Sequence, residues 1–257
     1  MNALAKAKAR NLHEKYCIST PDDLVDIEKI ANAEFLIVEE AELKDCLGVL
    51  VNSGDYGLIR ISNKIKEPGQ KRFVIAHEMG HFYNDRKFLR ECDEGDIICL
   101  KSSQIEFDAN EFAVEFLMRE EWFKDFIFRK EINMELIKSI AHNFGVSLSA
   151  SAIRYAHLGN HPVAVILSKN GKVLWSVVNE FFPYKYIPRN YTVKPGSGAY
   201  GFFNGGNGEE KILINAEVWF MADKKFLNGE DMILVEENLW MKNYNAVLTI
   251  VYEDKHK

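Results

Sequence analysis

The stretch that decides the expected fold is Phe73-Val74-Ile75-Ala76-His77-Glu78-Met79-Gly80-His81. Its apolar residues predict a buried helix, and Pro68-Gly69 supplies a break just upstream. His77 and His81 are four residues apart, so on a helix both imidazoles lie on one face, one turn above the other. Glu78 leans over the same face because it lies three residues before His81. The pattern therefore predicts a helix that brings two histidines to a single metal ion.

The residue types in this pattern suit a zinc ion. Zinc accepts neutral imidazole nitrogen at about 2.0–2.1 Å, and its catalytic sites use three protein ligands and leave a fourth position for water. Glu78 is then placed to take a proton from that water. The competing interpretation is a buried helix whose two histidines are hydrogen-bonded core residues.

A third ligand has to come from another part of the chain. Lys87 stands six residues after His81, where an extended pattern of this kind has a third histidine. The next predicted helix, about Ser103 to Met118, has a regular apolar stripe and carries Glu106 in its first turn. Ser103-x-x-Glu106 is also a capping-box pattern, in which Glu106 would cap its own helix. Two other acids of this helix are alternative ligands, Asp108 and Glu111.

Composition narrows the class of protein. With 257 residues, 47% of them apolar, the chain can bury one large core or two smaller ones. The net charge of −6 argues against a dedicated binder of nucleic acid or of anionic membranes. We expect a cytoplasmic protein, since no apolar run reaches about 18 residues and the start does not resemble a secretion signal. The four cysteines form no Cys-x-x-Cys pair and are expected to be free thiols: Cys17, Cys46, Cys92 and Cys99.

The first half of the chain reads as helices around a small sheet. Two helices are expected before the sheet, Ala3–Tyr16 and Pro21–Ala33, and three short strands should form it, Phe35–Val38, Gly48–Val51 and Gly57–Ser62. The last strand ends shortly before the histidine helix, so the two are expected to pack together. If that strand lies at the edge of the sheet, a substrate peptide could add to it and be laid across the zinc.

The middle of the chain is helical. A segment rich in aromatic residues starts at Glu120 and reads as core packing. Helices at Asn133–Phe144 and Ser147–Leu158, with Gly145 between them, are typical of a helix-turn-helix. A DNA reader would show basic and amide side chains on the second helix, and this one offers Ser147, Ser149, Ser151 and Arg154, so a structural or partner-docking role is favoured over DNA contact.

The last hundred residues predict strands. Asn170-Gly171 is a hairpin turn between Val163–Leu167 and Val173–Val178, and later strands are expected at Ile212–Ile214, Met232–Val235 and Ala246–Tyr252. Gly196-x-Gly198-x-x-Gly201 matches a dinucleotide-binding fingerprint, but no apolar strand precedes it and glycines stand where a helix should begin. A flexible loop is the favoured interpretation of that segment.

Two segments together carry a resemblance to a known family. Arg72–His81 and Glu106-x-x-Ala109-Asn110-x-Phe112-Ala113 resemble the two signature segments of the ImmA/IrrE family of zinc metallo-endopeptidases. The resemblance implies that His77, His81 and Glu106 hold Zn²⁺ and that Glu78 is the catalytic residue. It further implies cleavage of a helix-turn-helix repressor, which switches on a stress response or a mobile element. The family segment commonly ends in Leu-Met-Pro, whereas this chain has Leu117-Met118-Arg119.

The resulting prediction is an α+β protein in three parts. Residues 1–130 would form a zincin-like metallopeptidase domain, residues 131–160 a helix-turn-helix-like segment, and residues 161–257 a β-rich domain for which the family suggests a sensory role. The expected activity is zinc-dependent endopeptidase action on a protein substrate, without membrane or DNA binding. Tyr83 and His142 are candidates for stabilising the oxyanion. The alternative is a zinc-containing regulator that binds a repressor or other protein without cleaving it.

Overall fold

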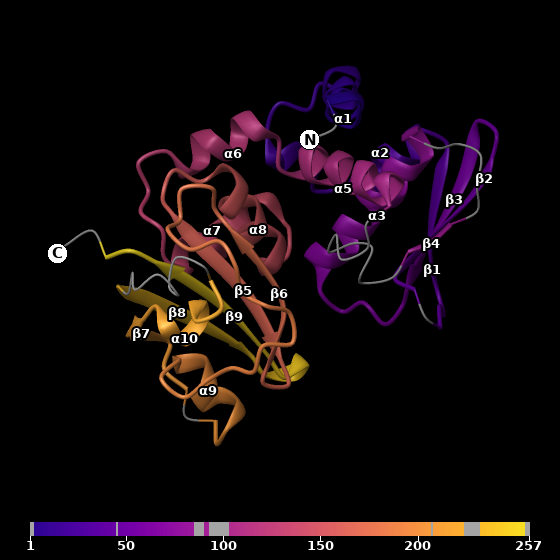
Figure 1. Ribbon diagram of the computed structural model, residues 1–257. Helices are drawn as coiled ribbons and strands as arrows, with labels where there is room; N and C mark the ends of the chain where they lie inside the picture. The colour runs from indigo at the N-terminus through magenta and orange to yellow at the C-terminus, as the bar shows by residue number, and fades with distance from the viewer. Residues whose placement is uncertain are drawn as a thin grey trace. The chain divides into compact units, whose positions relative to one another are not determined.

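The structure is a computed structural model that describes residues 3–44, 46–84, 90–92, 103–206, 208–223 and 232–254, with the backbone alone at 90–92. The chain divides into two compact units (Figure 1). Unit 1 comprises Met1–Phe126 with Ile140–Ser147, and unit 2 comprises Ile127–Ser139 with Leu148–Lys257. The three-part organisation with boundaries near 130 and 160 stays a prediction. Lys87 and Cys99 lie outside the described residues, as does the side chain of Cys92.

Unit 1 is mainly helical. Its helices are α1 (Ala3–Lys15), α2 (Ile27–Ala33), α3 (Pro68–Asn84), α5 (Gln104–Leu117) and α6 (Glu120–Ile127), and the end of α7 (Met134–Phe144) belongs to it as well. The single helix expected from Pro21 to Ala33 is wrong, because a separate 3₁₀ turn, η1 (Pro21–Leu24), precedes α2. The Asp26 carboxylate accepts a hydrogen bond from the Lys29 backbone N–H and so starts a new helix there.

The sheet of unit 1 contains β1 (Leu36–Ala41), β2 (Gly48–Ser53), β3 (Tyr56–Ser62) and β4 (Arg90–Cys92), in the order β1-β3-β2-β4. β3 pairs in parallel with β1 and antiparallel with β2, so it is an interior strand. The expectation that a peptide adds to the edge of Gly57–Ser62 is therefore wrong, because its backbone groups are already paired on both sides. Helix α3 packs against β2 and β3.

Arg72, on the first half of α3, ties three segments of unit 1 together. Its guanidinium donates to the backbone carbonyls of Leu24 at 2.7 Å, Phe144 at 3.1 Å and Gly145 at 2.8 Å. These carbonyls belong to the end of η1 and to the end of α7, where helices leave acceptors unsatisfied. Gly145 has a φ of +57°, and a Cβ there would lie 1.7 Å from an Arg72 nitrogen. Gly145, which the sequence places between two helices, therefore also makes room for the guanidinium.

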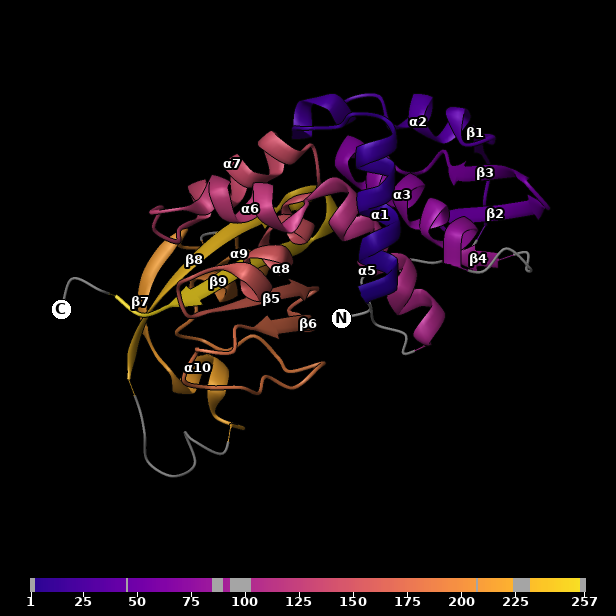
Figure 2. The same cartoon turned by 90° about the horizontal axis from the view of Figure 1, so that it is seen from above.

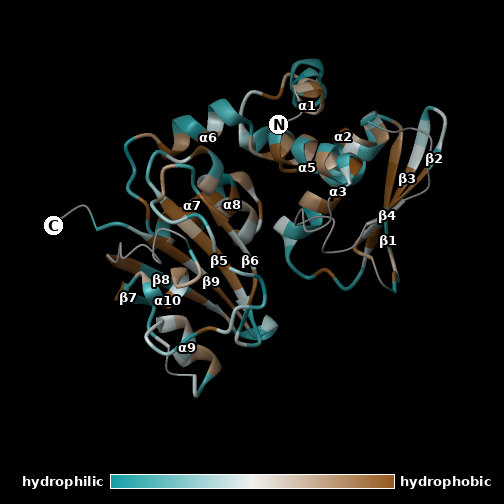
Figure 3. Ribbon diagram, in the orientation of Figure 1, coloured by the Kyte–Doolittle hydropathy of each residue, from teal (hydrophilic) through white to brown (hydrophobic). Residues whose placement is uncertain are grey.

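Unit 2 is built on a five-stranded antiparallel sheet (Figure 2). Its strands are β5 (Val163–Lys169), β6 (Lys172–Val178), β7 (Lys211–Asn215), β8 (Ile233–Met241) and β9 (Ala246–Tyr252), in the order β6-β5-β9-β8-β7. Helix α8 (Leu148–Leu158), the short helices α9 (Gly198–Phe203) and α10 (Glu217–Phe220) and the 3₁₀ turn η2 (Lys242–Tyr244) complete it. The central strands β5 and β9 are buried almost throughout, so both faces of the sheet are covered there. Figure 3 shows the apolar character of these strands.

Helix α8 buries the basic side chain that the sequence offered for DNA contact. It packs against β5 and β6, and Ser151 and Arg154 are buried in that packing, Arg154 with 4% of its surface exposed. Arg154 is the basic side chain that the sequence offered for contact with a phosphate or base. The structure therefore supports the structural role that the sequence favoured for this segment.

The glycine-rich segment is a short helix, and the expectation of a flexible loop is wrong. Helix α9 begins at Gly198, and its N-cap Ser197 donates through Oγ to Glu236 Oε1 at 2.8 Å. The backbone N–H of Ala199 also donates to Glu236 Oε1, at 3.2 Å. A carboxylate of the protein thus takes the place that a phosphate occupies at a dinucleotide-binding helix, which agrees with the rejection of a nucleotide site.

Candidate metal centre

The site is created by the close approach of α3 and α5, which lie side by side in unit 1 (Figure 1). Gly80 makes this approach possible, since a Cβ at that position would lie 2.8 Å from the carbonyl oxygen of Ala109. Both positions are small, so the helix backbones meet without a side chain between them. Their contact brings the histidine face of α3 against the first turn of α5, where Glu106 lies.

Three side chains converge where the helices meet. His77 Nε2 lies 3.0 Å from His81 Nε2 and 3.2 Å from Glu106 Oε2, and His81 Nε2 lies 3.3 Å from the same oxygen. The candidate ligand atoms of these residues all lie within 4.8 Å of one another, and all three residues are buried. Among the described residues, this is the group of histidine, cysteine and acidic side chains arranged to hold a metal ion.

The spacing of these atoms fits a tetrahedral metal. Ligands about 2.0–2.1 Å from a tetrahedral ion lie about 3.3 Å from one another, close to the three distances found here. Two imidazole nitrogens and one carboxylate oxygen are also a donor set typical of zinc. The helical spacing of His77 and His81 and the position of Glu106 are therefore suited to binding one metal ion.

Asn110 orients one of the imidazoles. Its Oδ1 lies 3.1 Å from His77 Nδ1, and Asn110 has 3% of its surface exposed. A carboxamide oxygen can only accept, so Asn110 can hold a proton on His77 Nδ1, and in that tautomer Nε2 is free to bind a metal. Asn110 lies one turn after Glu106 on α5, so one helix supplies both a candidate ligand and the residue that orients another.

Glu106 has two roles in the structure, one through its backbone and one through its side chain. Its backbone N–H donates to Ser103 Oγ at 3.3 Å, which caps the start of α5. Its carboxylate faces the two histidines, so Ser103 caps the helix and the Glu106 side chain lies where the ligand interpretation places it. Burial alone would raise the pKa of Glu106, but the hydrogen bonds with His77 and His81 lower it below its usual range. Asp108, an alternative ligand, instead accepts a hydrogen bond from Gln104 on the same helix.

Glu78 lies beside this cluster and is fully buried. It belongs to α3 between the two histidines, and it is not one of the three residues whose ligand atoms converge. Its carboxylate lies against Gly48 at the start of β2, so closely that a Cβ at Gly48 would be 2.4 Å from Glu78 Oε1. The sheet thus brings its backbone close to this carboxylate at Gly48.

The two oxyanion candidates, Tyr83 and His142, lie on α3 and α7. The Tyr83 hydroxyl donates to Glu34 Oε2 at 2.6 Å, and its ring stacks on Phe112 with centroids 5.5 Å apart. His142 is exposed on α7, and no contact described for it reaches the cluster. Oxyanion stabilisation by either side chain stays a prediction.

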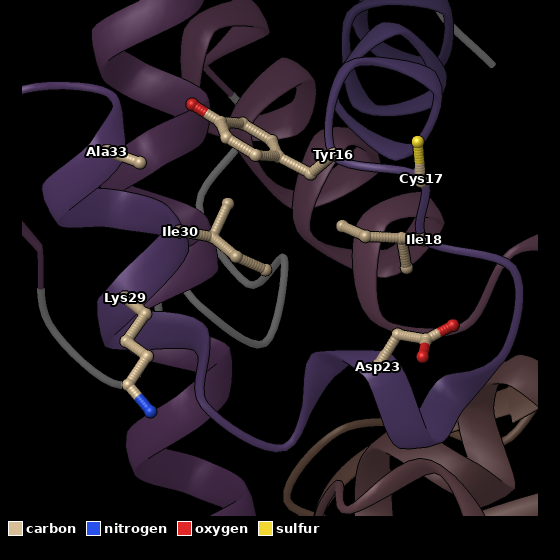
Figure 4. Close-up of a pocket in the computed structure, with 7 residues that line it drawn as sticks. All are labelled: Tyr16, Cys17, Ile18, Asp23, Lys29, Ile30 and Ala33. Atoms are coloured by element: carbon tan, nitrogen blue, oxygen red, sulfur yellow. The ribbon is translucent and has the colours of Figure 1, made fainter.

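A surface pocket of about 340 Å³ lies elsewhere in unit 1, between the end of α1 and α2 (Figure 4). None of its lining residues belongs to the histidine and glutamate cluster: Tyr16, Cys17, Ile18, Asp23, Lys29, Ile30 and Ala33. The polar ones have partners within the fold, since Asp23 accepts from the backbone N–H groups of Ser19 and Thr20 and Lys29 pairs with Asp26. The pocket is therefore separate from the candidate metal centre.

The fold and the cluster define a metallopeptidase-like domain, and comparison with known proteins finds a family that it matches. Residues 37–155 match the family described as the IrrE N-terminal-like domain, peptidase M78. The resemblance found in the sequence is thereby confirmed. A Mycobacterium tuberculosis transcriptional regulator of known structure is similar in fold, with a TM-score of 0.58 and 14% identity over 99% of this chain and 90% of that chain. No curated protein sequence matches this chain.

None of the described helices is both long enough and apolar enough to cross a lipid bilayer.

Proposed function

We propose that this protein is a zinc-dependent endopeptidase that cleaves a protein substrate, and that the substrate is a helix-turn-helix transcriptional repressor. The observation that carries the proposal is the convergence of His77, His81 and Glu106, with the buried Glu78 between the two histidines on α3. The IrrE-type family of residues 37–155 supports the peptidase activity, and the repressor as substrate rests on the family resemblance alone.

Each residue has a separate part in the proposed reaction. His77, His81 and Glu106 would hold zinc, which when bound activates a water molecule and polarises the carbonyl to be attacked. Asn110 keeps the Nδ1 proton of His77 in place, so its Nε2 stays available as a ligand. Glu78 accepts the proton of the attacking water and returns it to the amine that leaves when the peptide bond breaks.

Glu78 separates the two candidate functions, because zinc binding does not require it and hydrolysis does. We would add zinc-loaded wild-type protein or Glu78→Gln to lysate of the source cell and compare the new protein N-termini by mass spectrometry. A discrete terminus made by the wild type and absent with Glu78→Gln supports the protease and identifies its substrate and bond. Glu106→Ala serves as the second variant and is expected to lose both zinc affinity and cleavage.

The alternative, a zinc-containing regulator that only binds its partner, predicts a different pattern. Wild type and Glu78→Gln would then bind zinc equally, capture the same partner and produce no new terminus. Equal cleavage by wild type and Glu78→Gln would remove Glu78 from the mechanism and contradict the proposal as stated.

A further inference from the structure

Gly48, at the start of β2, makes an unusually close approach to Glu78. A Cβ built at Gly48 would lie 2.4 Å from Glu78 Oε1, 3.1 Å from Glu78 Cδ and 2.7 Å from Val74 Cγ1. Side chains do not tolerate contacts of this length, so any residue larger than glycine has to displace one of these atoms. The carboxylate of Glu78 therefore occupies the space that the side chain of any other residue at position 48 would need.

The backbone at Gly48 cannot simply move away to make room. Gly48 is paired with Ile61 of β3 on one side and with Cys92 of β4 on the other. The neighbouring Leu47 carbonyl also accepts a hydrogen bond from the Ser62 N–H at 2.9 Å. Because the strand is held on both sides, a side chain added at Gly48 would move the flexible end of Glu78 before it moved the strand.

We propose that Gly48 is a positioning residue for Glu78: its lack of a side chain sets where the carboxylate of the general base lies relative to His77 and His81. This inference rests on the proposed function only for its effect on catalysis. The contact between Gly48 and Glu78 is a property of the fold and can be tested without a substrate. Isolated glycine in a strand is the sequence pattern typical of such a close backbone approach.

The contact is tested first by stability. Gly48→Ala, Glu78→Ala and the double variant of the full chain would be unfolded in urea, with the free energy of unfolding compared in a double-mutant cycle. We expect Gly48→Ala to lower the urea midpoint in the wild-type background and to lower it much less when Glu78 is already alanine. An equal loss in both backgrounds, relieved instead by Val74→Ala, would overturn the inference.

The catalytic consequence is tested with a quenched fluorescent peptide that spans the cleavage site found by the Glu78→Gln comparison. We expect Gly48→Ala to lower kcat about 100-fold, as a displacement of a catalytic group by about 1 Å can do, while KM and zinc affinity stay within twofold of wild type. Gly57→Ala in β3 is the matched control, because its Cβ would lie 2.5 Å from Leu36 Cδ2 and is crowded by a leucine in place of Glu78.

The possible results separate the two proposals. If the wild type cleaves and Gly48→Ala cleaves equally well, the positioning role is wrong and the protease stands. If the wild type produces no cleavage, the proposed function fails. The double-mutant cycle in urea then tests the contact between Gly48 and Glu78 by itself. Equal loss of kcat in Gly48→Ala and Gly57→Ala would show a general effect of crowding the sheet and would also overturn the inference.

Discussion

Replacing Asn110 by alanine should weaken metal binding without unfolding the protein. The change removes the oxygen that lies 3.1 Å from His77 Nδ1, in a place where His77 is fully buried and water has little access. A buried donor left without its partner costs about 1–3 kcal/mol, which corresponds to about 5- to 150-fold in affinity. Loss of such a partner behind a metal-binding histidine typically costs about 10- to 100-fold, so both estimates agree.

Zinc affinity would be measured by competition with a chromophoric chelator, and folding of the metal-free protein by circular dichroism. Asn110→Asp is the matched control, because it keeps an acceptor at the same position and should bind zinc at least as well as the wild type. If Asn110→Ala remains folded and binds zinc within twofold of wild type, the orienting role given to Asn110 is incorrect.

Two further predictions concern the stability of unit 1. Arg72→Met removes three hydrogen bonds to backbone carbonyls. We expect it to lower the free energy of unfolding, measured in urea, by about 2–4 kcal/mol. A loss below about 1 kcal/mol would contradict the role assigned to Arg72. The hydrogen bonds from Lys124 and Lys6 lower the pKa of Glu120 from 4.5 to about 2. The ionised form of Glu120 therefore stabilises the fold above pH 4.5, and this stabilisation is lost as the pH falls toward 2. Glu120→Gln should therefore cost about 1 kcal/mol at pH 7, after allowance for solvent screening, and much less at pH 2.5; an equal cost at both pH values would exclude the ion pairs as its cause.

The parts of the site that depend on local spacing could be predicted from the sequence. His77, Glu78 and His81 lie within a single helix, and the face they share follows from helix geometry alone. The choice of Glu106 as their partner depends on how α5 packs against α3. The capping pattern and the ligand pattern share the same residues, so spacing could not separate them, and the structure shows that Glu106 uses its backbone for one and its side chain for the other.

The features that the sequence did not predict depend on contacts between segments far apart in the chain. Gly57–Ser62 was recognised as a strand, but whether it lay at the edge depended on β1 joining it in parallel across a long connection. The sequence did not predict the start of α9 at Ser197, because the buried residue that accepts a hydrogen bond from Ser197, Glu236, lies far along the chain. Asn110 stood within the family segment without a role, since its partner His77 is on another helix.

The path of the chain between its two units limits how it can be shortened. Unit 1 is completed by Ile140–Ser147, which the chain reaches only after passing through Ile127–Ser139 of unit 2. Within unit 1, Arg72 donates to the Phe144 and Gly145 carbonyls, and a Cβ at Gly69 would lie 2.4 Å from the backbone of Val146. A chain cut after Phe126 therefore loses part of the support of the histidine helix. A boundary after residue 147 is therefore needed to express unit 1 alone, to fuse it to another protein or to exchange unit 2. The product would carry Ile127–Ser139 without the rest of unit 2.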